Sequence, residues 1–185
     1  MLERFYSVPL WRTSWQDTPW LERLQELSHK QQFTQHPEWR SHGLSDPTFE
    51  HSVLAGEPEL QTAVLAEAGH YLSAVGSDCR ASLTESWMTN TATGQYAHVH
   101  DHKGTSISGV VYVQSHPEAG DLFFPHPHHN LAHTDFLTHD PTHLSIAPTT
   151  GTVILFPSWL QHGVRTNTTP HTRISLSFNL KAACG

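Results

Sequence analysis

The sequence contains little cysteine, few basic residues and no long apolar segment. Its two cysteines, Cys79 and Cys184, are far apart among 185 residues, so they imply no disulfide framework and the reducing cytoplasm is the expected compartment. Ten Lys and Arg against 17 Asp and Glu give a formal net charge of −7. This charge argues against a general binder of nucleic acid or anionic membranes, and favours a basic partner or a neutral small molecule. No apolar run approaches the roughly 18 residues of a membrane-spanning helix, and the first residues lack the apolar core of a signal peptide.

Motifs of several catalytic classes are also missing. The chain has no recognisable nucleophile elbow, phosphate-binding loop or paired-carboxylate motif. Histidine, in contrast, is abundant, with 17 residues. Several histidines are scattered through the N-terminal half and are expected to occupy polar surface, namely His36, His42, His51 and His70. Because histidine is so common here, only spacing and context can identify a candidate ligand.

The periodicity of apolar residues changes along the chain. Residues 18–31 and 57–75 have apolar positions at helical spacing, and the second segment stops at Gly76, as helices often do. Residues 33–56 are polar and broken by Pro and Gly, which predicts a long irregular connection. Short strands are expected after residue 78, at 82–90, 96–102, 106–113, 121–124, 143–147, 152–156, 162–165 and 172–180.

These strands are closely spaced and separated by Gly and Pro, which is typical of a sandwich or a barrel. The prediction is a single domain that is mainly β with flanking helices. Residues 1–80 would form a helical support with two helices packed outside, and residues 81–185 a β jelly-roll core. Residues 125–141 are rich in His and Pro and predict a loop longer than a turn.

A candidate metal-binding pair lies at the end of the strand expected at 96–102. Side chains alternate along a strand, so His100 and His102 share one face while Asp101 points the other way. Two neutral imidazoles at this spacing can bind one metal ion. A polar strand end in a histidine-rich chain would give the same spacing without any metal. His98 lies on the same face, so His98 and His100 are an alternative pair of ligands.

Two later segments add to this pair. His162 opens a strand after Pro157 and could face the pair across a barrel, although a lone histidine there is more often structural. In the last strand, alternation places a polar row on one face, made of Arg173, Ser175, Ser177 and Asn179. An exposed sheet face would explain this row equally well. A guanidinium beside a hydroxyl is also suited to bind a carboxylate through paired hydrogen bonds.

Taken together, these segments resemble the Fe(II)/2-oxoglutarate-dependent oxygenases of the double-stranded β-helix (cupin-like) class. The segments that carry the resemblance are Gly94-Gln-Tyr96-x-x-x-His100-x-His102, Ser106-x-Ser108-Gly109-Val-Val-Tyr112-Val, Gly120-x-Leu-Phe-Phe, Leu155-Phe-Pro-Ser-Trp-Leu-x-His162-x-Val and Arg173-Ile-Ser-x-Ser-Phe-Asn. A weaker likeness extends to the N-terminus. The specific part therefore lies between Gly94 and Asn179.

The resemblance implies a role for each matching residue. Residues His100, His102 and His162 would bind Fe(II), Arg173 with Ser175 would bind the distal carboxylate of 2-oxoglutarate, and Tyr112 could add a hydroxyl to that contact. The implied activity is a dioxygenase that uses O2, hydroxylates a small-molecule or peptide substrate, and releases succinate and CO2.

The sequence departs from the family pattern in two places. Most members have two histidines and a carboxylate, whereas this chain has His-Asp-His. Either His102 replaces the carboxylate, which is the preferred interpretation, or a bulge lets Asp101 reach the metal. The segment Phe124-Pro-His126-Pro-His128-His129 stands where the family tends to have an acid and an arginine, so substrate contacts do not carry over there.

Two other functions use the same residues differently. A cupin-like metalloenzyme with Zn or another divalent metal would use the three histidines and would not need Arg173 and Ser175. A non-catalytic jelly-roll binding module would need neither. A homodimer is also possible, because several aromatic residues near the N-terminus could be exposed, namely Trp11, Trp15, Trp20 and Trp39.

Overall fold

The computed structural model of the chain describes residues 8–34, 43–48, 50–125 and 143–185. In chain order, its elements are β1 (Trp11–Ser14), α1 (Pro19–Ser28), β2 (Asp46–Pro47), α3 (Pro58–Ala74), β3 (Arg80–Thr91), β4 (Ala97–His100), β5 (Ile107–Gln114), β6 (Leu122–Pro125), β7 (His143–Ile146), β8 (Thr152–Pro157), β9 (His162–Val164) and β10 (Arg173–Ala183). The strands form an antiparallel six-stranded sheet in the order β1-β8-β5-β10-β3-β2 and an antiparallel four-stranded sheet in the order β4-β9-β6-β7. The predicted fold class, mainly β with flanking helices, is confirmed.

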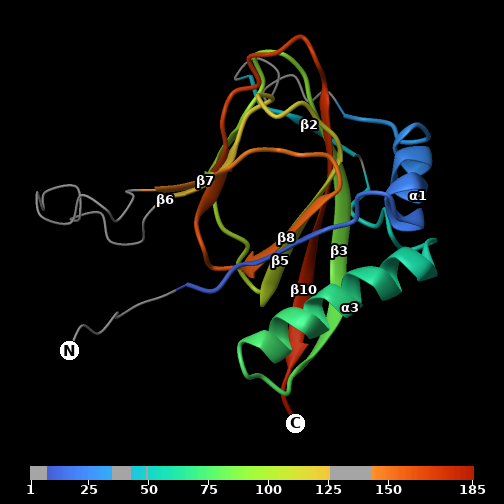
Figure 1. The fold of residues 1–185 in the computed structure, drawn as a ribbon, viewed down its shortest axis with the longest axis vertical. Coiled ribbons are helices and arrows are strands. Elements are labelled where there is room, and N and C mark those ends of the chain that lie inside the picture. The colour runs from blue at the N-terminus through green and yellow to red at the C-terminus, as the bar shows by residue number, and fades with distance from the viewer. Residues whose placement is uncertain (1–7, 35–42, 49, 126–142) are drawn as a thin grey trace, which may run out of the picture.

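Both predicted helices are present and contact the six-stranded sheet. The helix α1 begins after Thr18, whose Oγ1 accepts a hydrogen bond from the Leu21 N–H, and Pro19 occupies its first position. The helix α3 is followed by Gly76, at a φ of +77° that favours glycine. Figure 1 shows α1 on the opposite side of the strands from β6 and β7. Of the described helices, none is long and apolar enough to cross a membrane.

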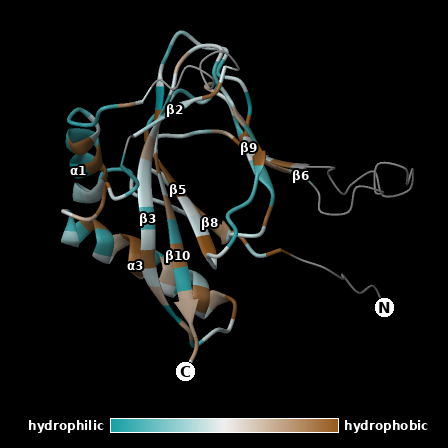
Figure 2. Ribbon diagram, turned by 180° about the vertical axis from the view of Figure 1, so that it is seen from behind, coloured by the Kyte–Doolittle hydropathy of each residue, from teal (hydrophilic) through white to brown (hydrophobic). Residues whose placement is uncertain are grey.

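Alternation along β10 separates two cores. Its apolar residues Leu176 and Phe178 are buried in the cluster that also contains the inner faces of both helices. A second buried cluster lies between the two sheets and includes Tyr112, Phe124 and Phe156. Figure 2 shows hydrophilic and hydrophobic residues along β10. The side chains of β10 alternate between its two faces, and both faces are buried. The apolar face packs against the helices, so the polar row faces the space between the sheets and not solvent.

The N-terminal segment contributes strands as well as helices. Strand β1 pairs with β8, and the two-residue β2 pairs with β3 inside the connection that was expected to be irregular. Both were missed because neither has enough residues to show an alternating pattern. The expected loop at 125–141 lies outside the described residues, apart from Pro125 at the end of β6.

A dimer was considered because several tryptophans near the N-terminus could be exposed, but those that the structure describes are at least partly buried. Trp15 is buried in the main core, and Trp11 and Trp20 pack against it partly buried. The indole N–H groups of Trp11 and Trp15 donate to the two carboxylate oxygens of Glu67, at 2.9 and 3.0 Å. Trp39 lies outside the described residues. The burial of Trp11, Trp15 and Trp20 therefore gives no support for a dimer.

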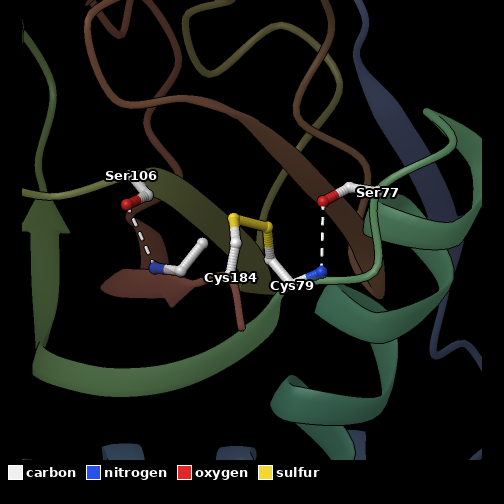
Figure 3. The surroundings of a disulfide bond; sticks show 5 residues. Ser77, Cys79, Ser106 and Cys184 are labelled. Atoms are coloured by element: carbon white, nitrogen blue, oxygen red, sulfur yellow. Dashed lines mark hydrogen bonds between the residues drawn. A yellow bond between two sulfur atoms is a disulfide. The ribbon is translucent and has the colours of Figure 1, made fainter.

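The two cysteines form a disulfide, which corrects the sequence-based expectation. Cys79 precedes β3 and Cys184 follows β10, and the last registered pair of these strands is Ala183 with Arg80. Strand pairing therefore brings together residues 105 positions apart (Figure 3), which sequence separation cannot reveal. The expectation of a reducing cytoplasm depended on unpaired cysteines and loses that support.

The disulfide predicts a measurable contribution to stability. Replacing Cys184 with Ser opens a covalent loop of 105 residues, and loss of a native disulfide typically lowers the free energy of unfolding by about 2–5 kcal/mol. Urea denaturation of the oxidised protein and of Cys184→Ser should show this difference. The double variant Cys79→Ser/Cys184→Ser is the control, because it should match the single variant and be insensitive to reducing agent. Equal stability of oxidised wild type and variants would contradict the prediction.

Candidate metal centre

Three histidines converge through the pairing of β4 with β9. His100 is the last residue of β4 and lies directly opposite His162, the first residue of β9. His102 follows two residues after His100, beyond the end of the strand. One ring nitrogen from each histidine lies within 4.8 Å of the others. Within the described part of the chain, this is the one group of three or more metal-ligating side chains that lie so close together.

Backbone hydrogen bonds orient two of the rings. The Nδ1 of His100 lies 2.8 Å from the His98 carbonyl oxygen, and the Nδ1 of His162 lies 2.9 Å from the Leu160 carbonyl oxygen. A carbonyl oxygen only accepts, so each Nδ1 carries the proton and each Nε2 keeps its lone pair. Such outer hydrogen bonds are typical of metal-binding histidines. The two rings are thus oriented as ligands by the protein alone.

Burial keeps the ring of His162 neutral. Only 6% of this residue is exposed, and burial, followed by the nearby His100, lowers the pKa of His162 to about 3, although the hydrogen bond to Leu160 acts in the opposite direction. Burial, followed by His100, also lowers the pKa of His102. Desolvation disfavours the imidazolium form. Both rings are therefore neutral at pH 7, which is the form that binds a metal.

This lowered pKa predicts a pH dependence of stability for the metal-free protein. Between pH 6.5 and about 3, the unfolded chain binds a proton at His162 that the folded chain does not. The contribution of neutral His162 to the free energy of unfolding is fully present above pH 6.5. It decreases as the pH is lowered through this window, by up to about 1.4 kcal/mol per pH unit. Urea denaturation at pH 7.5 and 5.0 should show a smaller decrease for His162→Gln than for wild type. Equal decreases in the two proteins would contradict this assignment.

The structure also places the two alternative ligands from the sequence. The register of β4 and β9 shifts between Ala97 and His100, so a bulge is present, but it precedes His100 and does not bring Asp101 into the histidine group. The ring of His98 packs edge-on against Tyr96, with centroids 5.0 Å apart, and is also outside the group. The described residues therefore bring together three histidines, and not two histidines with a carboxylate.

Arg173 lies at the start of β10 and is 2% exposed. Its Nη1 donates to the carbonyl oxygens of Ala119 and Gly120, at 3.2 and 2.7 Å, and its Nη2 donates to Thr91 Oγ1 at 2.9 Å. Its buried Nε has no hydrogen-bond partner. Burial lowers the pKa of Arg173, yet a guanidinium keeps its charge in proteins. A buried cation with a free donor is suited to an anion.

Ser175 and Tyr112 extend this polar row. They are opposite each other on the neighbouring strands β10 and β5. Tyr112 is 2% exposed, and burial raises its pKa to about 12, so its hydroxyl stays protonated and can donate. Arg173 and Ser175 of the predicted polar row thus lie near Tyr112, the residue that the resemblance added to them. Asn179 points to the same interior but belongs to a separate hydrogen-bond chain.

One cavity of about 390 Å³ joins the histidine group to the arginine row. Its lining includes His100, His102, His162, Tyr112, Arg173 and Ser175, together with apolar side chains such as Val110, Leu122 and Phe156. This volume is within the range of small-molecule sites. The metal candidates and the anion-binding candidates therefore face the same space.

Sequence reasoning missed several residues of this site. The Trp87 ring lies 5.7 Å from that of His102 and is stacked at 5.2 Å on His51, and it lines the cavity. Thr91 holds the guanidinium of Arg173. Both residues are on β3 with their side chains on one face, so alternation applied to residues 87–91 could have found them.

The fold and the site define a jelly-roll protein with a candidate metal centre beside a buried anion-binding row. A family model described as "Putative 2OG-Fe(II) oxygenase" matches residues 85–179, which are 95 of the 185 residues. The chain belongs to this family. It is therefore an oxidoreductase of the class whose cofactors are Fe(II) and 2-oxoglutarate, as the sequence predicted.

Solved structures confirm the predicted double-stranded β-helix fold. The epimerase SnoN from nogalamycin biosynthesis, in complex with Fe3+, alpha ketoglutarate and nogalamycin RO, is similar with a TM-score of 0.69 and 16% identity, over 95% of this chain and 81% of that chain. HygX from Streptomyces hygroscopicus, with nickel, 2-oxoglutarate and hygromycin B bound, has a TM-score of 0.63 and 15% identity, over 94% and 83%. A 2OG-Fe(II) oxygenase family oxidoreductase from Burkholderia pseudomallei has a TM-score of 0.64 and 15% identity, over 87% and 77%. No curated protein matches this chain.

Proposed function

We propose that this protein is an Fe(II)- and 2-oxoglutarate-dependent dioxygenase that hydroxylates a small molecule, with release of succinate and CO2. One observation carries the proposal. Arg173, whose buried Nε has no hydrogen-bond partner, and the three histidines line the same cavity. A metal site alone would not require the arginine, whereas a dicarboxylate that also contacts the metal would use both groups.

His100, His102 and His162 would hold Fe(II). Imidazole nitrogen is a suitable ligand for Fe(II), and two of the rings have their Nε2 lone pairs fixed by hydrogen bonds at Nδ1. Because all three ligands are neutral, the protein leaves the charge of the ion uncompensated. A dianionic co-substrate at the same ion would supply the missing negative charge.

Arg173, Ser175 and Tyr112 would hold the distal carboxylate of 2-oxoglutarate. The free Nε of Arg173 and the protonated hydroxyl of Tyr112 are donors, which suits a carboxylate acceptor. The Nη atoms of Arg173 already bind backbone carbonyls and Thr91. These contacts fix the guanidinium before any ligand enters, so little conformational entropy is lost on binding.

With Fe(II), 2-oxoglutarate and O2 bound, the cofactors supply the oxidising chemistry that replaces a C–H bond by C–OH. The protein's residues orient and shield these partners. Phe156, with its ring centroid 4.6 Å from that of His162, and Phe124 at 6.2 Å form apolar walls beside the histidines. Such walls exclude water from the reacting groups and strengthen the electrostatic contact to Arg173.

The substrate would be a small molecule that enters on the side of Trp87, Tyr96 and Leu44. These three side chains line the cavity, and none of them belongs to the arginine row or to the histidine group. The similar structures of HygX and SnoN contain hygromycin B and nogalamycin RO respectively. A cavity of about 390 Å³ is compatible with a compact ligand beside the co-substrate.

A Zn-dependent enzyme is the second candidate, because three histidines are also a catalytic zinc set. The two functions differ in one experiment. Protein loaded anaerobically with Fe(II) should develop a weak visible charge-transfer band on addition of 2-oxoglutarate, and should form succinate once air is admitted. If neither band nor succinate appears while Zn(II) binds, the dioxygenase proposal is wrong.

A further inference from the structure

A continuous chain of hydrogen bonds, buried in its middle, links Thr105 to Glu85. Thr105 Oγ1 lies 2.9 Å from Ser158 Oγ, which in turn lies 2.9 Å from Ser108 Oγ. Ser108 Oγ donates to Asn179 Oδ1 at 2.6 Å, and Asn179 Nδ2 donates to Glu85 Oε1 at 2.5 Å. The chain therefore connects five side chains from the β4–β5 loop, the β8–β9 turn, and strands β5, β10 and β3. We call it the Glu85–Thr105 chain.

The direction of every proton in this chain is determined. A carboxylate only accepts, so Asn179 must turn its NH2 toward Glu85 and its oxygen toward Ser108. The single proton of Ser108 is then used on Asn179, and its oxygen accepts from Ser158. The Ser158 oxygen in turn accepts from Thr105. Thr105 donates, Ser158 and Ser108 each accept once and donate once, and the chain ends at the carboxylate of Glu85.

Water does not compete with the contacts in the middle of this chain, although the Glu85 side chain at its end is 37% exposed. Ser108 is 2% exposed, and Ser158 and Asn179 are fully buried. In a dry environment each hydrogen bond is stronger, and a group left without its partner costs more. The chain therefore has one stable arrangement, and a change at one member is transmitted to the others.

Ser158 connects this chain to two of the three candidate ligands. Its carbonyl oxygen accepts from the His102 N–H at 2.9 Å, and Thr105 Oγ1 also lies 3.2 Å from the His102 carbonyl oxygen. Ser158 opens the turn that ends at His162, whose Nδ1 contacts Leu160. The pairing of β4 with β9 fixes His100 against His162, but His102 lies beyond β4. The hydrogen bond from its N–H to the Ser158 carbonyl oxygen holds its backbone.

We propose that the Glu85–Thr105 chain is the positioning element of the metal centre, with Ser158 and Asn179 as positioning residues that set His102 relative to His162 before a metal ion binds. This inference rests on the proposed function, because it assumes that the three histidines are ligands. None of the chain's side chains is itself in the histidine group. The chain acts on the metal only through the placement of His102 and His162.

An exchange of acid and amide tests this proposal with little change of shape. Asn179→Asp replaces the NH2 group that donates to Glu85 with a carboxylate oxygen. Two acceptors then face each other, and this hydrogen bond of the chain is lost. The pair Glu85→Gln with Asn179→Asp restores a donor facing an acceptor and preserves the net charge of the two residues. Ser177→Ala is the control, since Ser177 lines the same cavity from β10 without belonging to the chain.

The readout is the affinity and the visible spectrum of Co(II), a probe that binds imidazole ligands and reports their geometry. We expect Asn179→Asp to weaken Co(II) binding by about tenfold or more, as for outer contacts of metal ligands, and to change the spectrum. The exchanged pair should recover both properties, and Ser177→Ala should keep them. A merely structural chain would change the melting temperature without changing the spectrum of the bound ion.

Two results would overturn the proposal. One is an unchanged Co(II) affinity and spectrum in Asn179→Asp, and the other is a failure of the exchanged pair to recover them while it folds with the wild-type melting temperature. Failure of the proposed function is distinguishable from both, because it would show in the wild-type protein, either as no Co(II) binding at the histidines or as no charge-transfer band and no succinate with Fe(II) and 2-oxoglutarate.

Discussion

Replacing His162 with alanine is expected to abolish metal binding. His162 lies opposite His100 in the sheet, is 6% exposed, and its Nδ1 is held by the Leu160 carbonyl oxygen. Its removal leaves two histidines, of which His102 lies outside a strand. Calorimetric titration with Co(II) should show no binding at micromolar concentrations of protein and metal. The protein itself should stay folded, because loss of a neutral buried ring typically costs about 1–3 kcal/mol.

His98→Ala is the matched control for this experiment. His98 lines the same cavity and is two residues from His100, but it is outside the histidine group. We expect its Co(II) affinity to stay close to that of wild type. Loss of binding in both variants would show that the histidine group is wrongly assigned, and retention of binding in His162→Ala would exclude His162 as a ligand.

The same titration decides between His102 and Asp101. The geometry predicts that His102→Ala loses the metal and that Asp101→Ala keeps it, because only His102 has a ring nitrogen within 4.8 Å of the other two. The opposite result would restore the usual ligand set of two histidines and one carboxylate. It would also require the backbone at residues 100–102 to move from the position described here.

The site could be predicted wherever alternation applied to a long strand. The alternation in strand β10 predicted that Arg173 and Ser175 share one face, whereas their role in an interior site came from the family resemblance. His100 and His102 were also predicted together, although β4 ends at His100 and the register shifts before it. Their ring nitrogens do lie close together, which strand periodicity does not guarantee past the end of a strand.

The rest of the site depends on pairings between distant residues. The register of β10 with β3 brings Cys79 to Cys184 and Glu85 to Asn179, and no local pattern encodes that register. The partners of Arg173 are largely backbone carbonyl oxygens of residues 119 and 120, which have no sequence signature. Sequence reasoning therefore predicts which side chains face the interior better than it predicts what each one contacts.

Arg173→Ala is expected to weaken 2-oxoglutarate binding by about 2–5 kcal/mol, as when one partner of a buried charge pair is removed, and to leave the metal in place. Arg173 lines the cavity but is not in the histidine group. The measurement is calorimetric titration of Co(II)-loaded protein with 2-oxoglutarate, and separately of the metal-free protein with Co(II). Arg173→Lys should bind 2-oxoglutarate with intermediate affinity, because an ammonium keeps the charge but lacks the planar donor pair.

Arg165→Ala is the control for the loss of one positive charge. Arg165 packs over the Phe123 ring, 4.1 Å from its centroid, and does not line the cavity, so its variant should bind 2-oxoglutarate normally. Arg173→Ala also leaves two carbonyl oxygens and Thr91 without their donor, which should lower stability by about 1–3 kcal/mol. A melting curve separates that effect from binding. If folded, Co(II)-loaded Arg173→Ala bound 2-oxoglutarate as wild type does, the carboxylate would be held by other residues and the role proposed for Arg173 would be wrong.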